Sequence, residues 1–274
     1  MGQDSKIEWT DHTFNPWVGC TKVSPACDHC YAEAWAKRTG HPELWTGERR
    51  RTTAANWQQP LKWNKVASLS RRPRVFCASL ADVFDNQVPT RWRDDLWHRI
   101  DQTPNIDWLL LTKRPQNIPK MLPDPRTSVP AWGDGWPNVW LGTTIENKQH
   151  GAARAFHLAQ VPAKVRFWSV EPLLEDLGNL TPLCFYDTAI DGRVAVDWVI
   201  VGGESGGQAR HMNPDWARSI RDQCALRSEN IYGEAAFFMK QMTKKAPIPD
   251  DLMIREFPAP MPAPLTQHQR GQDG

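Results

Sequence analysis

The stretch "IDWLLLTKRP", residues Ile106–Pro115, joins a run of apolar side chains directly to three polar ones, Thr112, Lys113 and Arg114. A short, near-continuous apolar run is typical of a strand that is buried on both faces of a parallel sheet. The polar residues that follow it mark the end of that strand. This stretch therefore predicts a parallel sheet covered by helices.

The same pattern of an apolar run followed by polar residues recurs along the chain. It is found in Arg74–Phe84, Asn138–Asn147, Lys164–Pro172, Val196–Gly207 and Ala235–Met242. Three segments with helical character lie between these runs, namely Thr90–Gln102, Asn147–Gln160 and Asn213–Ser228. In the last of them, Asn213 is placed as an N-cap and Pro214 at the first helical position. This alternation predicts an α/β fold, either a barrel or an open doubly wound sheet.

Polar residues gather where each predicted strand ends. In a parallel barrel the carboxyl ends of the strands share one face, and that face carries the active site. A single polar residue there could instead cap the next helix. Six consecutive strands that end in this way indicate an enzyme, and the candidate residues are Ser79, Asp82, Thr112, Lys113, Arg114, Thr143, Thr144, Glu146, Ser169, Glu171, Gly202, Gly203, Glu204, Ser205, Lys240 and Gln241.

The composition is that of an ordinary water-soluble globular protein, with 40% hydrophobic and 23% charged residues among 274. The net charge of +2 excludes a general electrostatic attraction to nucleic acid, so such a surface would have to be local. No apolar run is long enough to span a membrane. The segment "MGQDSKIEW" at the start lacks the pattern of a signal peptide. We therefore expect a cytoplasmic protein, located in the host cytoplasm if a phage encodes it.

The chain is expected to divide at about residue 245. Residues 1–245 are predicted to form the barrel domain, and residues 246–274 a proline-rich C-terminal extension that is partly disordered. Within the barrel domain, the Asp-Gly pair in Tyr186–Val196 predicts a surface hairpin. The fifteen tryptophans are expected mainly in the core, with a few lining a pocket for a flat substrate such as a nucleobase.

Three cysteines, Cys20, Cys27 and Cys30, lie within eleven residues of one another. In a reducing compartment, clustered cysteines indicate a metal site or a catalytic site rather than disulfides. The Cys27/Cys30 spacing occurs in both zinc and iron–sulfur sites. An iron–sulfur cluster held by three thiolates keeps an open position at which a substrate or cofactor can bind, as in catalytic metal sites.

Zinc remains an alternative at this point. A structural zinc site usually has a second Cys-x-x-Cys or Cys/His pair, which is absent here. A fourth ligand would have to be His12, His29 or Cys77. A redox dithiol formed by Cys27 and Cys30 would leave Cys20 without a role.

A three-cysteine loop ahead of a β/α barrel resembles the radical S-adenosylmethionine superfamily. The resemblance implies a partial (β/α)6-type barrel with parallel strands, and a 4Fe-4S cluster on Cys20, Cys27 and Cys30. It also implies that S-adenosyl-L-methionine completes the cluster and is cleaved to a 5′-deoxyadenosyl radical, with an electron donor such as flavodoxin. The first gap of six residues is longer than the usual three, whereas Tyr31 after the last cysteine is retained.

Four motifs narrow the resemblance. They are "IEWTDHTFNPWVGCTKVSPACDHCYAE" (Ile7–Glu33), "WLLLTKRP" (Trp108–Pro115), "WVIVGGESG.QAR.M.PDW" (Trp198–Trp216) and "FFMKQM" (Phe237–Met242). Together they resemble a family of phage and prophage proteins, mostly of unknown function, within that superfamily. Some members are linked to thymidine hypermodification, in which an isomerase rearranges an amino acid already attached to the base.

The resemblance assigns roles to the strand-end residues. Ser79 and Asp82 lie where the superfamily holds the methionyl amine, although the usual Gly-Gly-Glu triplet is missing there. Lys113 and Arg114 would meet the methionyl carboxylate or a substrate anion. The remaining cofactor contacts would come from Thr143, Thr144, Glu146, Ser169, Gly202 and Gly203. Glu171, Glu204 and Lys240 are candidates for catalysis or substrate contact.

Three functions remain open. The first is a radical enzyme that acts on an amino-acid-modified thymidine in phage DNA or on a modified nucleotide, and the second is a radical enzyme for a peptide or small metabolite. The third is a zinc-stabilised, non-catalytic nucleic-acid-binding protein. If DNA is bound, the basic segments Glu48–Thr53 and Ser70–Arg74 are the expected phosphate contacts, through Arg49, Arg50, Arg51, Arg71 and Arg72.

Overall fold

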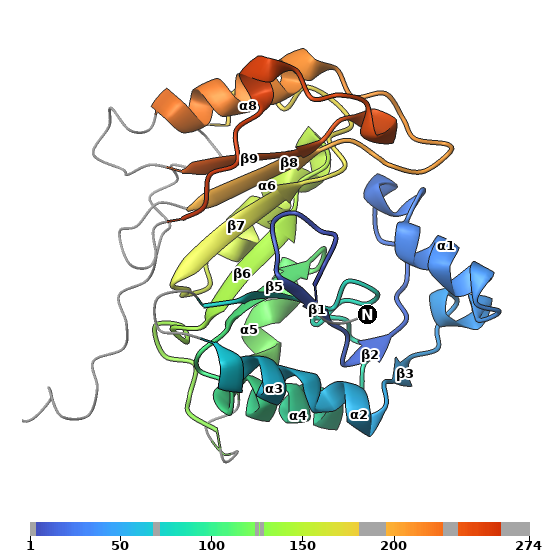
Figure 1. Ribbon diagram of the computed structural model, residues 1–274, viewed down its shortest axis with the longest axis vertical. Helices are drawn as coiled ribbons and strands as arrows, with labels where there is room; N and C mark the ends of the chain where they lie inside the picture. Colours follow the sequence, from blue (N-terminus) through green and yellow to red (C-terminus); the bar gives the residue numbers. More distant parts are fainter. Residues whose placement is uncertain are drawn as a thin grey trace, which may run out of the picture.

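The computed structural model describes residues 4–67, 72–123, 126, 129–180, 196–226 and 235–258. Its centre is a seven-stranded sheet in the order β1-β4-β5-β6-β7-β8-β9, in which every neighbouring pair is parallel. Figure 1 shows this sheet curling into a half-barrel. The strands are β1 His12–Phe14, β4 Arg74–Cys77, β5 Asp107–Thr112, β6 Val139–Thr144, β7 Val165–Val170, β8 Trp198–Gly202 and β9 Ala236–Gln241.

The structure confirms the predicted α/β fold and all six predicted strands. The additional strand is β1, which has only three residues and therefore gives no periodic signal. It pairs with β4 and brings the start of the cysteine loop to the edge of the sheet. A separate antiparallel pair, β2 Trp17–Val18 with β3 Arg50–Arg51, follows β1.

The three predicted helices are present as α4 Thr90–Asp101, α6 Lys148–Ala159 and α8 Pro214–Leu226. The carboxamide oxygen of Asn213 accepts a hydrogen bond from the Asp215 amide at 3.0 Å, which confirms the predicted N-cap. The other helices in the described ranges are α1 Tyr31–Arg38, α2 Ala54–Trp57, α3 Gln59–Val66 and α5 Ile118–Met121, with 3-10 turns at Pro25–Cys27, Pro42–Trp45, Pro115–Asn117, Thr243–Lys245 and Asp250–Leu252. None of the helices within the described ranges is long and apolar enough to cross a membrane.

The two faces of the sheet bury different sets of side chains. The outer face packs against α4, α6 and α8 in one large apolar cluster that includes Trp97, Trp108 and Trp168. The inner face holds a smaller, largely aromatic cluster of Trp9, Phe76, Leu109, Trp140, Val165, Phe167, Trp198, Ile200 and Phe238. Most tryptophans are therefore core residues, as expected.

The C-terminal extension contacts the barrel over residues 246–258. The Met239 amide of β9 donates to the carbonyl of Ile254, and the Glu256 amide donates to the carbonyl of Phe237. Phe257 packs against Trp198 and Phe238, with ring centroids 5.3 Å apart in both cases. This segment thus helps to close the aromatic cluster, while residues 259–274 and most of the predicted hairpin lie outside the described residues. The domain boundary at residue 245 stays a prediction.

Candidate functional site

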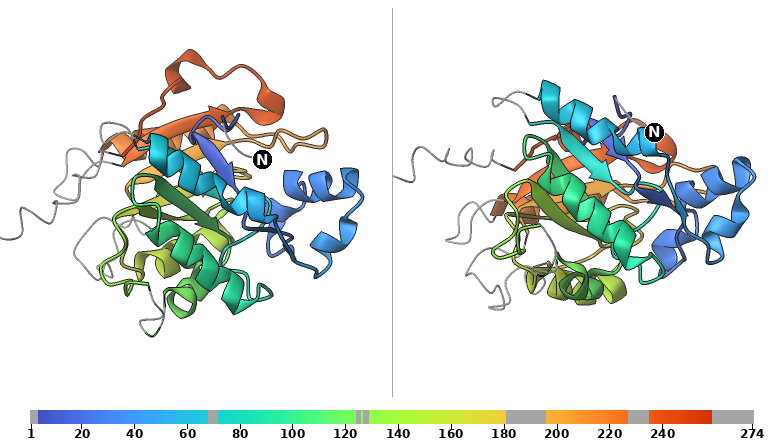
Figure 2. Two further views of the ribbon diagram at one scale, coloured as in Figure 1. Left: turned by 60° about the horizontal axis from the view of Figure 1, so that its bottom comes forward. Right: turned by 90° about the horizontal axis from the view of Figure 1, so that it is seen from below.

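The cysteine loop, residues 19–30, connects the β2 strand to α1 and lies at the carboxyl ends of the sheet strands. The amide of Gly19 donates to the carbonyl of Leu80, just beyond β4, at 3.0 Å. Gly19 has a φ of +113°, and an added Cβ would lie 2.5 Å from the carbonyl oxygen of Glu48. Only glycine fits this position, so Gly19 determines the position of Cys20, the first cysteine of the loop. Figures 1 and 2 show α1, which follows the loop, projecting from one end of the half-barrel.

Arg114 lies beyond the end of β5 and makes the first set of polar contacts between the cysteine loop and the sheet. Its guanidinium donates to the Cys20 sulfur at 3.6 Å and to the carbonyl and hydroxyl oxygens of Thr21 at 3.0 Å each. It also pairs with the Asp82 carboxylate at 3.0 Å. Burial alone would lower the pKa of Arg114, but the nearby Asp82 and Cys20 raise it above its ordinary value, so the side chain stays charged.

Residues just beyond β4 make the second set of polar contacts with the cysteine loop. The Tyr31 hydroxyl donates to the carbonyl of Ser79 at 2.7 Å, and the carboxamide of Asn15 donates to the Ser79 hydroxyl at 2.9 Å. The same carboxamide accepts from the Leu80 amide at 2.7 Å. Ala78 turns the chain here with a φ of +63°, which is uncommon for a residue other than glycine. Ser79 is therefore held beside the loop.

Glu204 lies beyond the end of β8 and makes the third set of polar contacts with the cysteine loop. Its carboxylate accepts from the His29 ring at 2.8 Å and pairs with the Arg210 guanidinium at 2.5 Å. Arg210 also donates to the carbonyl of Pro25 at 2.8 Å and pairs with Asp28 at 3.3 Å. Burial would raise the pKa of Glu204, but the hydrogen bonds from Arg210 and His29 more than offset this and lower it. Glu204 was predicted as catalytic, and the structure places it in this network.

All three cysteines of the loop are free thiols. Burial raises the pKa of the Cys20 thiol to about 11, Asp82 adds to the rise, and Arg114 opposes it. A metal or cluster binds the thiolate form, so its binding would have to displace the proton that burial favours. Cys27 is buried, whereas Cys20 and Cys30 are half-buried.

A mononuclear zinc site is not formed among the described residues, where no three His, Cys, Asp or Glu side chains could hold one metal ion. The proposed fourth ligands are engaged elsewhere. His12 stacks on Trp63 at 4.5 Å, His29 bonds to Glu204, and Cys77 is fully buried in the outer core. The three free thiols on one loop stay the candidate ligands of a 4Fe-4S cluster, in which each thiolate would bind a different iron.

Asp82 is saturated with hydrogen bonds inside the protein. One carboxylate oxygen accepts from the Phe84 amide at 2.9 Å and the Thr112 hydroxyl at 2.7 Å. The other accepts from the Lys113 amide at 3.1 Å and from Arg114 at 3.0 Å. A carboxylate has about four acceptor positions. Asp82 therefore acts as the anchor of Arg114, and its predicted contact with a methionyl amine stays a prediction that competes with this role.

A polar layer lies above the aromatic cluster on the inner face of the sheet. Thr144 and Ser169 are direct neighbours across β6 and β7, in line with the inward-facing Phe167. The Thr144 hydroxyl is buried without a hydrogen-bond partner. Glu171 pairs with Lys240 from the far side of β8. A Cβ on the intervening Gly202 would lie 3.3 Å from Glu171, so the glycine lets these two side chains meet.

The remaining predicted cofactor contacts are packed more deeply. The Thr143 hydroxyl donates to the carbonyl of Thr112 at 2.9 Å. Glu146 is fully buried and pairs with Arg154 at 2.5 Å, while its second oxygen has no hydrogen-bond partner. A Cβ on Gly203 would lie 2.7 Å from the Thr243 amide, so the protein itself needs this glycine. Lys113 has no ion pair recorded among the described residues. Direct ligand contacts by these residues stay predictions.

The arginines of the two basic segments are less available for contact with phosphate than the sequence predicts. Arg49 is buried in an ion pair with Asp85 at 2.5 Å, where its side chain is only 2% exposed. Arg72 pairs with Asp107 at 2.7 Å. Arg49 is therefore not available as a free phosphate contact, because its charge is buried and neutralised. For Arg72, contact with phosphate stays a prediction. Arg50 is exposed, and Arg71 lies outside the described residues.

Sequence reasoning missed two residues that organise the site. Asn15 is fully buried and joins the start of the loop to Ser79 and Leu80. Arg210 holds Glu204 and the loop carbonyl of Pro25. Both stand within motifs of the sequence, but their partners are distant along the chain. A local pattern gives no signal for such pairings.

Comparison with solved structures gives the same fold in a known enzyme. Spore photoproduct lyase complexed with dinucleoside spore photoproduct matches with a TM-score of 0.52 and 11% identity, over 88% of this chain and 78% of that chain. A variant of that lyase with bound AdoMet and dinucleoside spore photoproduct matches with a TM-score of 0.51 and 11% identity, over 89% and 79%. The fold expected for a radical S-adenosylmethionine protein is thereby confirmed.

Comparison by sequence is less informative about activity. A search of curated protein sequences finds no match. A family model does match, and it spans nearly all of the described structure. Because residues 4–257 fit the model described as "Protein of unknown function (DUF5131)", the chain belongs to that family.

Proposed function

We propose that this protein is a radical S-adenosylmethionine enzyme that acts on a nucleobase in DNA or in a nucleotide. The observation that carries the proposal is the position of the cysteine loop. Residues beyond three strands, Arg114, Ser79 and Glu204, hold the loop over a polar layer at one end of an otherwise apolar interior. In parallel β/α folds this is the end that carries chemistry.

The three thiols would hold a 4Fe-4S cluster, with Cys20, Cys27 and Cys30 each binding one iron. Such a cluster, when bound, supplies an electron for reductive cleavage of S-adenosylmethionine. Arg114 contributes positive charge beside Cys20, which favours the thiolate form that a metal requires. Asp82 keeps that guanidinium in place.

The polar layer would receive the cofactor and substrate. Thr144 offers a buried hydroxyl without a hydrogen-bond partner. Buried polar atoms of this kind are costly unless a ligand or water satisfies them. The Glu171–Lys240 pair lies in the same layer with side chains 18% and 19% exposed, where it could bind polar groups or move a proton.

The proposal of a nucleobase substrate rests on the likeness to spore photoproduct lyase and not on particular residues of this chain. Spore photoproduct lyase matches along most of both chains and holds AdoMet and a dinucleoside in its structures. The most specific form of the proposal is rearrangement of an amino acid attached to thymidine in phage DNA, as the sequence resemblance suggests. A base in a duplex would first have to be extruded.

The test uses anaerobically reconstituted protein with a reductant and S-adenosylmethionine. DNA that carries an amino-acid-modified thymidine is incubated with it, digested to nucleosides and analysed by chromatography and fragmentation mass spectrometry. An isomerisation leaves the mass unchanged, so the expected result is a shift in retention time and fragmentation. The matched control is Cys27→Ala, which should give no product. Unchanged nucleosides together with turnover of a peptide or small metabolite would refute the nucleobase proposal.

A further inference from the structure

The turn after β9 holds two successive lysines in an unfavourable backbone conformation. Lys244 has a φ of +54° and Lys245 a φ of +57°. The left-handed region is uncommon for residues other than glycine, whereas glycine adopts it without steric cost. Lysine is therefore the less favourable residue for the backbone at both positions. Such outliers concentrate at functional sites, so the two lysine side chains are candidates for ligand contact.

We call Thr243–Lys245 the lysine turn, and it lies next to the candidate site. The Lys244 amide donates to the carbonyl of Glu204 at 2.8 Å. The carboxylate of Glu204 in turn binds His29 of the cysteine loop. Figures 1 and 2 show the turn after β9 and the loop after β8 at the end of the half-barrel from which α1 projects. The lysine turn is therefore linked to the cysteine loop through Glu204.

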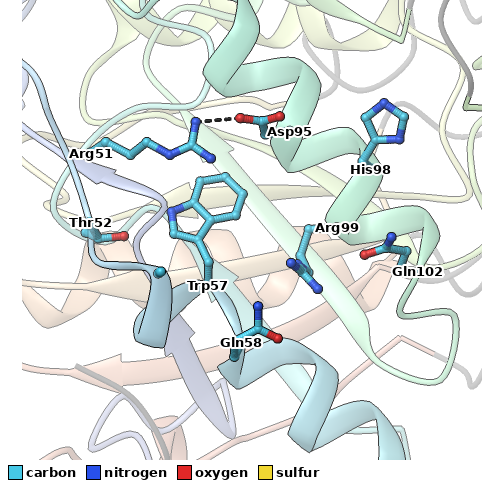
Figure 3. A pocket seen from close by; sticks show the side chains of 9 residues that line it. Arg51, Thr52, Trp57, Gln58, Asp95, His98, Arg99 and Gln102 are labelled. Atoms are coloured by element: carbon cyan, nitrogen blue, oxygen red, sulfur yellow. Dashed lines mark hydrogen bonds and ion pairs between the residues drawn. The ribbon is translucent and has the colours of Figure 1, made fainter.

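No described residue neutralises the two charges of the lysine turn. Both lysines are exposed, and neither forms an ion pair within the part of the chain that the structure describes. By contrast, Arg218 of α8 pairs with Asp251 at 2.8 Å. Arg51 pairs with Asp95 at 2.5 Å at the wall of a separate cavity, as Figure 3 shows. The lysine turn therefore favours an anion at the edge of the candidate site.

The exposed segment 205–208 continues directly from Glu204, and we call it the glycine loop. Neither Gly206 nor Gly207 has a positive φ. A Cβ added to either glycine would meet nothing within 4 Å. The fold therefore does not require glycine at these positions, but glycine leaves the backbone open to close approach by a ligand. The glycine loop thus adds an open stretch of backbone beside the two lysine charges.

We propose that the lysine turn and the glycine loop bind a phosphate group of the substrate. This rests on the proposed function, in which the target base is part of DNA or of a nucleotide. Lysine is a flexible point charge that pairs with phosphate oxygens from any direction. Phosphate contacts position a nucleotide without reading its base, so these contacts would orient the base at the site. The phosphate could belong to a DNA strand or to a free nucleotide.

The test is fluorescence anisotropy of a labelled single-stranded thymidine oligonucleotide, titrated with the purified full-length chain at several salt concentrations. For Lys244→Met/Lys245→Met we expect weaker binding. We also expect the slope of log K against log salt to become shallower by about 1.4, since each phosphate contact to a single strand contributes about 0.7. The matched control is Lys62→Met/Lys65→Met on α3, far from β9 in Figure 1, which removes the same charge at two exposed lysines. It should leave the slope unchanged.

Thermal unfolding separates a ligand role from a structural one. If Lys244→Met/Lys245→Met fails to fold, Lys244→Gly/Lys245→Gly replaces it, because glycine adopts the observed φ values without strain. Loss of folding in both double variants would overturn the proposal. An unchanged slope after substitution of the lysine turn, or an equal change in the α3 control, would also overturn it and leave the two lysines to an acidic protein partner.

Competition identifies the source of the phosphate. Displacement of the oligonucleotide by thymidine 5′-monophosphate and not by thymidine would identify a free nucleotide, and displacement by neither would identify DNA. Equal displacement by both, or no binding of either the oligonucleotide or the monophosphate, would overturn the proposal. The measurement uses neither iron nor S-adenosylmethionine. Absence of phosphate binding would therefore refute this site alone, whereas bound DNA that yields no product in the reductive assay would refute the proposed reaction.

Discussion

The interior of the half-barrel is aromatic towards the amino ends of its strands and polar towards their carboxyl ends. The aromatic end is closed by Trp9 from the N-terminal segment and by Phe257 from the C-terminal extension, both packed around Trp198. The polar end is covered by the cysteine loop, which is held by ion pairs and hydrogen bonds. Cys20 and Cys30 also pack against a small apolar cluster that includes Leu80. The same strands build both ends.

Along each strand, the aromatic end contributes most of the stability, and the polar end holds the candidate functional residues. In β7, Phe167 at the aromatic end and Glu171 beyond the strand face the same interior, four residues apart. Burial of large rings contributes free energy of folding and tolerates no polar ligand. The polar end contributes less, and the Thr144 hydroxyl there is buried without a hydrogen-bond partner. Substitutions at the two ends should therefore have different consequences.

The largest effect is expected from Cys27→Ala. Loss of one of three thiolates should reduce the iron and sulfide bound after anaerobic reconstitution to nearly none, because the cluster then lacks a protein ligand. Iron and sulfide assays with the absorbance spectrum measure this. The matched control is Cys224→Ala, a buried cysteine on α8, which should keep the cluster. Equal iron in both variants would contradict the assignment of the loop.

A large loss of stability without loss of cluster is expected from Trp198→Ala. Trp198 is fully buried and contacts Trp9, Phe167 and Phe257. Its truncation should lower the free energy of unfolding by about 3–5 kcal/mol, measured by denaturant titration. Phe156→Ala, at an exposed position, should change it by about 0.5 kcal/mol or less. Loss of iron in folded Trp198→Ala would show that the two ends are not separate.

An intermediate effect on both properties is expected from Asp82→Asn. The substitution removes the charge that pairs with Arg114, at a cost of about 1.5–3 kcal/mol in the free energy of unfolding. Because Arg114 also contacts Cys20 and Thr21, iron content should fall as well. Unchanged iron with weaker S-adenosylmethionine binding, measured by equilibrium dialysis, would instead support direct contact between Asp82 and the cofactor.

The smallest effect on stability is expected from Lys240→Met. The Glu171–Lys240 pair is reached by water, so its loss should change the free energy of unfolding by only about 1 kcal/mol. Iron content should be unchanged. Denaturant titration of Lys240→Met, Glu171→Gln and the double variant gives the coupling between the two side chains. A loss of several kcal/mol would mean that the pair is structural and that the polar end also carries stability.

The strands and the site face could be predicted because their signals are local. The apolar run of β5 ends at Thr112, and the polar residues after it lie at the site as expected. The contacts that hold the cysteine loop could not be predicted, because their partners are distant in the sequence. Arg114 is 94 residues from Cys20, and Arg210 is 185 residues from Pro25. Likewise, the pairing of Arg49 with Asp85 depends on the fold, and "ERRRTT" alone reads as free surface charge.

We propose that the cysteine loop holds a 4Fe-4S cluster with one position left for S-adenosylmethionine. The most direct measurement is electron paramagnetic resonance of the reduced, anaerobically reconstituted full-length chain, recorded with and without S-adenosylmethionine. We expect a reduced 4Fe-4S signal whose g-values shift when the cofactor is added, and no such signal in Cys27→Ala. A stable zinc content near one per chain with no iron uptake, or a cluster signal that S-adenosylmethionine leaves unchanged, would contradict it.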